Sequence, residues 1–207
     1  TRLYLLLAAG LFGLYAVLVP MVWAAARRFR RNFEQHAFLA LHDPLTGLPN
    51  RLQLVSATER LLSNPEGAAT GGVLMLLDLD GFKDVNDSLG HAAGDELLID
   101  VADRLRVSAP RGSSIARLGG DEFAIVWPGR ASPQGARAGA RAMLVAFDTP
   151  FDVRGMSVAI DASVGIAVAG LHGDTTEELM QRADIAMYAA KRGKRRLTVY
   201  SDDLDSM

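Results

Sequence analysis

The chain has 207 residues, of which 49% are hydrophobic, and its 22 Lys and Arg against 24 Asp and Glu give a formal net charge of −2. This length is enough for one domain with a substantial core plus one additional element. The absence of cysteine excludes a disulfide scaffold or a cysteine-based metal site. The near-neutral charge gives no electrostatic case for binding nucleic acid.

The N-terminal segment, residues 3–26, contains no charged side chain and predicts a transmembrane helix. A helix of this length, rising about 1.5 Å per residue, can cross a hydrocarbon core of about 30 Å. Four arginines within residues 27–31 follow directly, and the positive-inside rule places that flank in the cytoplasm. Two alternatives stay open: a signal peptide, because residues 24–26 are all alanine, and a buried helix of a soluble protein.

Residues 27–41 predict a short cytoplasmic connecting helix with Phe29 and Phe33 on one side, which could pair with a second chain. This pairing signal extends over less than two heptads. After it, Asn50 is a suitable N-cap for an amphipathic helix.

The first acidic cluster follows an apolar run over residues 72–79, which fits a strand buried on both faces. The run ends in Asp78 and Asp80, and an acid in this position needs a metal, a cation or backbone donors nearby. Helical spacing continues from about residue 82 to residue 109. Taken singly, Asn86 and Asp95 have ordinary interpretations as loop, cap or first-turn residues.

The second acidic cluster is the stretch Arg117-Leu118-Gly119-Gly120-Asp121-Glu122-Phe123. Its glycines predict a tight hairpin between two strands, because glycine reaches positive φ without steric cost. Alone, such a turn could be purely structural. Beside the first cluster, it predicts that Asp78 and Asp121 converge at the ends of neighbouring strands. Two carboxylates near a backbone carbonyl suit Mg²⁺ or Mn²⁺ rather than zinc.

The remaining sequence predicts a helix at about 132–147 and strands at 151–153 and 157–168 around an Arg154-Gly155 turn. A helix at 175–191 and a last strand at 197–200 follow. The order is β-α-β-β-α-β with additions. It predicts an α/β (α+β) fold with a mainly antiparallel sheet and helices packed on one side.

The two acidic clusters together resemble the GGDEF family of diguanylate cyclases. The residues that carry the resemblance are Asp78-Leu79-Asp80-x-Phe82-Lys83-x-x-Asn86-Asp87-x-x-Gly90-His91-x-x-Gly94-Asp95 and Gly119-Gly120-Asp121-Glu122-Phe123. Residues 43–51 are similar to the opening of the family's domain, and residues 183–191 to its closing helix. The resemblance implies a GGDEF domain at 42–200 with a nucleotidyl-cyclase-like fold, related to polymerase palms and ferredoxin-like folds.

The resemblance also implies the activity, that of a diguanylate cyclase, and the uncharged segment followed by arginines would anchor this enzyme in the bacterial inner membrane with its GGDEF domain in the cytoplasm. It condenses two GTP molecules into cyclic di-GMP, releases two pyrophosphates and acts as a homodimer. At matching positions, Asp78, the carbonyl of Leu79 and Asp121 hold Mg²⁺ (or Mn²⁺), and Glu122 supports the metal site. Asp121 is also the implied base for the ribose 3′-hydroxyl.

Further matching positions would bind the substrate. The main chain of Gly81, Phe82 and Lys83 and the side chains of Lys83, Lys191 and Arg195 are implied phosphate contacts, Lys83 being counted with the catalytic residues. The implied guanine contacts are Asn86 and Asp95, whose carboxylate can accept from guanine N1–H but faces an acceptor in adenine.

Two departures from the family pattern concern regulation and geometry. Many members carry Arg-x-x-Asp shortly before the glycine pair as an inhibitory product site, but the corresponding residues here are Pro110 and Ser113, so we expect no product inhibition there. After Arg195 the family usually has Asn, and this chain has Arg196.

The acidic tail, residues 201–207, resembles the start of a connector to an EAL phosphodiesterase domain. An alternative function is therefore a catalytically weak GTP-binding module that regulates such a domain.

Overall fold

The computed structural model describes residues 12–13, 15–16, 18–23, 27, 40–63, 71–129 and 132–206. The chain divides into two units, Thr1–Ala40 and Leu41–Met207. Within the described part, no helix combines the length and the apolar character needed to cross a membrane. The predicted transmembrane segment, 3–26, and the predicted connecting helix, 27–41, lie largely outside the described residues.

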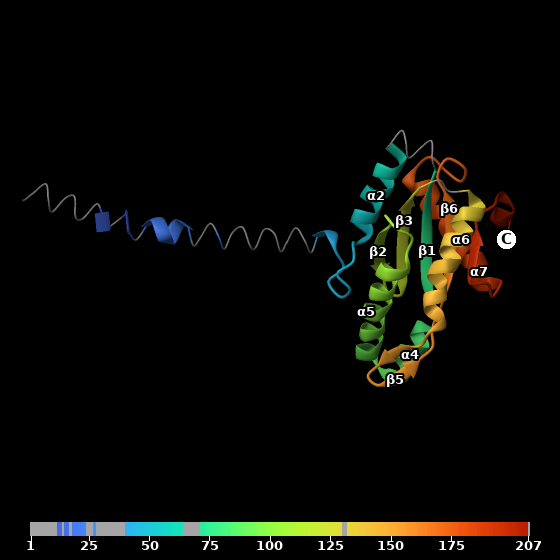
Figure 1. The fold of residues 1–207 in the computed structure, drawn as a ribbon, viewed down its shortest axis with the longest axis horizontal. Coiled ribbons are helices and arrows are strands. Elements are labelled where there is room, and N and C mark those ends of the chain that lie inside the picture. Colours follow the sequence, from blue (N-terminus) through green and yellow to red (C-terminus); the bar gives the residue numbers. More distant parts are fainter. Residues whose placement is uncertain are drawn as a thin grey trace, which may run out of the picture. The chain divides into compact units, whose positions relative to one another are not determined.

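The second unit contains a five-stranded sheet in the order β2-β3-β1-β6-β7 (Figure 1). The central strand β1 is antiparallel to both β3 and β6, β2 is antiparallel to β3, and β7 runs parallel to β6. The sheet is therefore mixed, with one parallel edge. Its strands are β1 Gly72–Asp80, β2 Ser114–Gly119, β3 Glu122–Pro128, β6 Asp161–Val168 and β7 Leu197–Val199.

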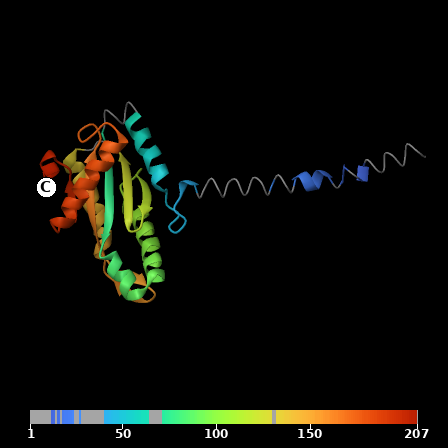
Figure 2. The same cartoon turned by 180° about the vertical axis from the view of Figure 1, so that it is seen from behind.

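Helices cover both faces of this sheet, so the prediction of helices on one side was wrong. One face carries α4, α5 and α6, and the other carries α2 and α7 (Figures 1 and 2). The reason lies in β1, where Val73 and Met75 enter one core while Leu74 and Leu76 enter the other. The helices are α2 Arg51–Ser63, α4 Phe82–Leu89, α5 His91–Ser108, α6 Pro133–Leu144 and α7 Thr176–Arg192.

The helix ends follow the local chemistry of the sequence. The Asn50 side chain accepts from the backbone N–H groups of Leu52 and Gln53, at 3.0 and 3.3 Å, which confirms the predicted cap of α2. Gly90, with φ of 85°, separates α4 from α5 within the predicted 82–109 helical region. The predicted 132–147 helix continues beyond α6 as the 3-10 turn Val145–Asp148.

The predicted strand 157–168 is in fact two strands in different sheets. Phe151–Val153 (β4) pairs with Met156–Val158 (β5) as a separate hairpin, and β6 begins only at Asp161. Arg154 turns this hairpin with φ of 56° and forms an ion pair with Glu96 of α5 at 2.8 Å. The hairpin is thereby attached to the beginning of α5, one residue from Asp95.

Gly165 allows α7 to pack directly against the middle of β6. A Cβ added at Gly165 would lie 2.0 Å from the Ala183 carbonyl oxygen and 2.2 Å from the Met187 nitrogen. Only glycine permits this approach, because the obstructing atoms belong to the helix backbone. The contact fixes α7 over the sheet, and its last turn carries Lys191.

Candidate active site

The strand register brings the two acidic clusters together. Asp78, near the end of β1, lies directly opposite Glu122, the first residue of β3. Residues that face each other across a strand pair point to the same side of the sheet. The Leu79 N–H also donates to the carbonyl of Asp121 at 3.3 Å, which ties the hairpin tip to β1. The predicted convergence of the end of β1 with the hairpin tip is confirmed at the level of the backbone.

Lys191 supplies the counter-charge at this edge of the sheet. Its Nζ lies 2.5 Å from Oδ1 of Asp78, a residue that is only 7% exposed. The Lys191 side chain itself is 41% exposed. The resemblance assigns Lys191 to substrate phosphates, and this role stays a prediction; in the structure its ammonium group contacts Asp78, the implied metal ligand.

The electrostatics of the carboxylates follow from burial and crowding. Burial raises the pKa of Asp78, and the charges of Asp121 and Asp80 add to this, while Lys191 opposes it. Burial also raises the pKa of Glu122, together with the charges of Asp78 and Asp121. Burial alone would lower the pKa of Lys191, but its contact with Asp78 and the charges of Asp121 and Asp80 prevail and raise it. The site favours added positive charge.

The donor set fits a hard divalent cation, because it contains only oxygen and its carboxylates repel one another. Asp78 and Glu122 are adjacent, and Leu79 and Asp121 are joined through their backbones. Within residues 40–63, 71–129 and 132–206, however, no three Asp, Glu, His or Cys side chains are grouped closely enough to hold a metal ion. Mg²⁺ is commonly bound by one or two carboxylates plus substrate phosphates, so the nucleotide would complete this donor set.

The predicted substrate-binding residues lie at the β1–α4 turn and along α4 and α5. Gly81 has φ of 82°, and its carbonyl accepts from the N–H groups of Asp84 and Val85 as α4 begins. Phe82 is buried in the core, whereas Lys83 and Asp95 are exposed. Their side chains are therefore accessible to a nucleotide.

Gly94 allows α4 and α5 to pack closely against each other. A Cβ at Gly94 would lie 2.0 Å from Oδ1 of Asn86 and 3.2 Å from the ring of Phe82. The half-buried Asn86 thus packs against the residue that precedes Asp95. The two implied guanine contacts lie on neighbouring helices.

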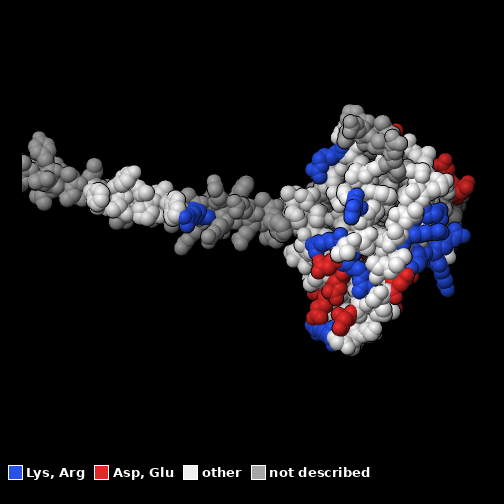
Figure 3. Space-filling model, in the orientation of Figure 1, with Lys and Arg blue, Asp and Glu red and all other residues white. Residues whose placement is uncertain are grey.

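Arg195 lies in a different environment from Lys191. With Arg137, Arg141 and Arg196 it lines a pocket of about 270 Å³ between α6 and the start of β7. Figure 3 shows the basic side chains gathered in this region. No contact joins Arg195 to the acidic residues in the described part of the chain, so its phosphate role stays a prediction.

Arg196, which replaces the family's usual Asn, has a clear structural role. Its guanidinium contacts Asp148 and Asp161 at 2.7 Å each and donates to the Leu144 carbonyl at 2.9 Å. It thereby joins the end of α6 to the beginnings of β6 and β7. The departure from the family pattern is accommodated by these acids.

A brace behind the hairpin was missed by the sequence interpretation. The Arg117 guanidinium lies 2.9 Å from Oδ1 of Asp43 and donates to the Gly120 carbonyl at 2.8 and 3.2 Å. Asp43 also accepts from the N–H and hydroxyl of Thr46. The available signal was Arg117 as the one charged residue of strand β2. The brace holds the turn that carries Asp121.

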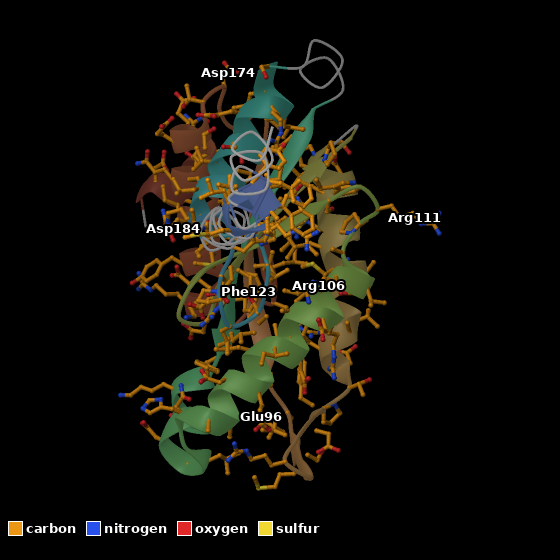
Figure 4. All side chains as sticks on the ribbon, turned by 90° about the vertical axis from the view of Figure 1, so that its left-hand side faces the viewer. Glu96, Arg106, Arg111, Phe123, Asp174 and Asp184 are labelled. Carbon is orange, nitrogen blue, oxygen red and sulfur yellow. The ribbon has the colours of Figure 1, made fainter. Side chains whose placement is uncertain are left out.

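Two further features near the carboxylates were also missed. The Ser163 hydroxyl lies 3.0 Å from each carboxylate oxygen of Asp80, which fixes this acid two residues beyond Asp78. A cleft of about 290 Å³ between α2 and α7 is lined by Glu122, Arg51 and Asp184 among apolar residues. Figure 4 shows Asp184 on the α7 side of the domain.

Comparison with known proteins agrees with this geometry. A family model described as the GGDEF domain of diguanylate cyclase matches residues 40–197. The chain is 43% identical over 153 residues to MucR of Pseudomonas aeruginosa, a bifunctional diguanylate cyclase/cyclic di-GMP phosphodiesterase, covering 74% of this chain and 22% of MucR. The chain spans between about one fifth and two fifths of the length of the curated relatives it matches.

The solved structures that resemble this chain are also GGDEF domains. The isolated GGDEF domain of TpbB from Pseudomonas aeruginosa has a TM-score of 0.76 and 35% identity, covering 80% of this chain and 97% of that one. The coiled coil and GGDEF domain of DgcB from Caulobacter crescentus, solved in complex with c-di-GMP, has a TM-score of 0.75 and 32% identity, covering 90% and 98%.

The sheet order, the helices on both faces and the acidic hairpin beside β1 define a cyclase-like α+β domain. The chain belongs to the GGDEF family of diguanylate cyclase domains.

Proposed function

We propose that this domain is a diguanylate cyclase that condenses two GTP molecules into cyclic di-GMP with release of two pyrophosphates. The observation that carries the proposal is the placement of Asp78 opposite Glu122. The Asp121 carbonyl accepts from the Leu79 N–H beside them, and Lys191 forms an ion pair with Asp78. A group of carboxylates beside a cationic side chain supports metal-assisted nucleotidyl transfer.

In this proposal each side chain has a separate task. Asp121 accepts the proton of the ribose 3′-hydroxyl, whose oxygen attacks the α-phosphorus of the second GTP, and the bond to pyrophosphate breaks. Lys83 and Lys191 bind the phosphates, with Arg195 as a further contact, and the N–H groups at Gly81–Lys83 contribute donors. Asp78, the Leu79 carbonyl, Asp121 and Glu122 would hold Mg²⁺ or Mn²⁺, which lowers the hydroxyl pKa and neutralises leaving-group charge.

Base selection is assigned to Asn86 and Asp95. The Asp95 carboxylate accepts hydrogen bonds from N1–H and N2–H₂ of guanine. Adenine would present its N1 acceptor to the same acid, leaving two acceptors facing each other. The site would therefore prefer GTP over ATP.

Each domain would bind one GTP, so turnover requires a homodimer in which two sites face each other. We also propose that residues 3–26 anchor the chain in the bacterial inner membrane with the GGDEF domain in the cytoplasm. The uncharged segment followed by four arginines within residues 27–31 supports this arrangement.

The test is GTP turnover by the 207-residue chain fused to a dimerising leader, with Mg²⁺ present, against an Asp121→Ala control. We expect cyclic di-GMP from the wild type and none above background from the variant. GTP binding without product in the wild type would overturn the cyclase proposal.

A second candidate function is a GTP-binding module that regulates a cyclic di-GMP phosphodiesterase. Two relatives favour it: MucR is bifunctional by name, and PdeR of Escherichia coli, 37% identical over 166 residues, is named as a cyclic di-GMP phosphodiesterase. A measurable GTP affinity in the absence of turnover would support this alternative.

A further inference from the structure

Lys191 occupies the position on Asp78 that the proposed metal ion would need. The Nζ lies 2.5 Å from Oδ1 of Asp78, whose carboxyl side chain is 11% exposed and so has little room for a second cation. An ammonium group and a divalent ion on one carboxylate oxygen repel each other strongly where water is largely excluded. The two cations are therefore alternatives at this oxygen.

The helix that carries Lys191 cannot withdraw to resolve this conflict. Its backbone packs on Gly165 with no space for even a Cβ, so α7 is fixed against β6. The Lys191 side chain, by contrast, is 41% exposed at the last turn of α7. A flexible four-carbon side chain can leave Asp78 by rotation alone.

We propose that Lys191 is an exchanging counter-ion, which neutralises Asp78 in the empty site and passes to the nucleotide phosphates when the metal ion binds Asp78. The inference rests on the proposed function for the identity of the metal ligand and of the phosphates. In this proposal the Lys191 ammonium group has two successive anionic partners, first Asp78 and then the nucleotide phosphates.

The exchange couples metal binding to nucleotide binding. Without nucleotide, the metal ion must displace Lys191 from Asp78, and the ammonium group loses the carboxylate with which it forms an ion pair. With nucleotide, the phosphates accept this ammonium group and also complete the metal's oxygen ligands. By linkage, the nucleotide then tightens metal binding and the metal tightens nucleotide binding by the same factor.

The test measures Mn²⁺ affinity rather than turnover. Free Mn²⁺ is followed by electron paramagnetic resonance in titrations of the full chain. Each titration is performed with and without a GTP analogue whose α–β bridging oxygen is a methylene group, corrected for Mn²⁺ held by the analogue alone. The variants are Lys191→Met, which keeps a good helix former, and Lys194→Met as the matched control. Lys194 has the same charge, lies in the turn directly after α7, and forms no ion pair with Asp78 in the described part of the chain.

We expect Lys191→Met to bind Mn²⁺ on the order of fivefold more tightly than the wild type without nucleotide. The gain in Mn²⁺ affinity on adding the analogue should shrink by about the same factor. Lys194→Met should match the wild type in both conditions.

Three results would overturn the inference: unchanged or weaker Mn²⁺ binding in Lys191→Met, equal tightening in Lys194→Met, or no measurable Mn²⁺ binding in either variant. The readout is independent of the cyclase reaction. A chain that makes no cyclic di-GMP but shows the expected Mn²⁺ pattern would overturn the proposed activity and leave the exchange in place.

Discussion

The packing of α7 on Gly165 predicts that Gly165→Ala is unusually destabilising for the addition of one methyl group. The new Cβ would lie 2.0 Å from the Ala183 carbonyl oxygen, 2.2 Å from the Met187 nitrogen and 2.7 Å from its Cα. Carbon atoms do not approach such atoms closer than about 3 Å, so α7 and β6 must separate by about 1 Å. Overpacking of this kind costs about 1–3 kcal/mol, and we expect about 2–3 because only backbone atoms can move.

The same displacement should affect the site. Lys191 lies one helical turn beyond Met187, so its Nζ moves with the helix relative to Asp78. We therefore expect a lower kcat for cyclic di-GMP formation in addition to the loss of stability. The assay is urea denaturation followed by far-UV circular dichroism, with initial rates measured on the fraction that remains folded.

Gly139→Ala is the matched control. Its Cβ would lie 2.7 Å from the ring of the partly buried Trp127, so the obstructing atoms belong to a side chain and not to the backbone, and alanine is a better helix former than glycine in α6. We expect its unfolding free energy to change by less than about 1 kcal/mol. A loss below about 0.5 kcal/mol in Gly165→Ala, comparable with the control, would refute the argument that α7 is held rigidly on β6.

Three further predictions concern the hairpin and its surroundings. Arg117→Met should lower kcat and cost about 2 kcal/mol of stability, because the Gly120 carbonyl loses its donor and Asp43 loses one of its donors. Arg106→Met, which removes a bond to the Thr46 carbonyl and an exposed ion pair with Asp103 but no contact with the hairpin, should leave kcat unchanged. Burial would raise the pKa of Asp43, but hydrogen bonds from Thr46 and Arg117 prevail and lower this pKa below 3.8. The ionised Asp43 therefore stabilises the folded state fully at pH values above 3.8, and this contribution is lost as the pH falls through the lowered pKa. The difference in urea stability between wild type and Asp43→Asn should thus be smaller at pH 3 than at pH 7, and an unchanged difference would contradict this. Micromolar cyclic di-GMP should leave the initial rate unchanged, since residues 110 and 113 are uncharged and Arg111 extends away from the domain (Figure 4); a steep drop in rate would show a product site.

The elements near the chemistry were the most predictable from sequence. The glycine pair, the acids and the apolar runs on either side identify the β2–β3 hairpin and the end of β1, because turn chemistry and strand length are local properties. Asn50 as the cap of α2 is predictable for the same reason. Asp78 opposite Glu122 then follows once the strands are neighbours.

The layers of the fold were less predictable. A strand buried on both faces requires cover on both faces, so β1 already contained the evidence against helices on one side. The division of 157–168 at Ala159 and Ile160 has no glycine or proline to mark it, and only pairing with β4 and β1 separates the two strands. The partners of Arg196, at Asp148 and Asp161, are distant in sequence and leave no local pattern.

The segment Leu41–Asn50 has a mechanical consequence. It closes on itself through bonds from Asn50 to the Leu41 carbonyl, at 2.9 Å, and from Asp43 to the Leu48 carbonyl, at 2.8 Å. The backbone N–H of Arg117 donates to the carbonyl of Pro49 in this segment at 2.9 Å, and the Arg117 guanidinium joins Asp43 to the Gly120 carbonyl of the hairpin. At the beginning of the domain, the segment is therefore a loop held by hydrogen bonds within itself and to Arg117. A force applied at Leu41 would therefore act on two elements: on α2 through the Asn50 N–H, and on the Gly120 carbonyl through the Arg117 guanidinium.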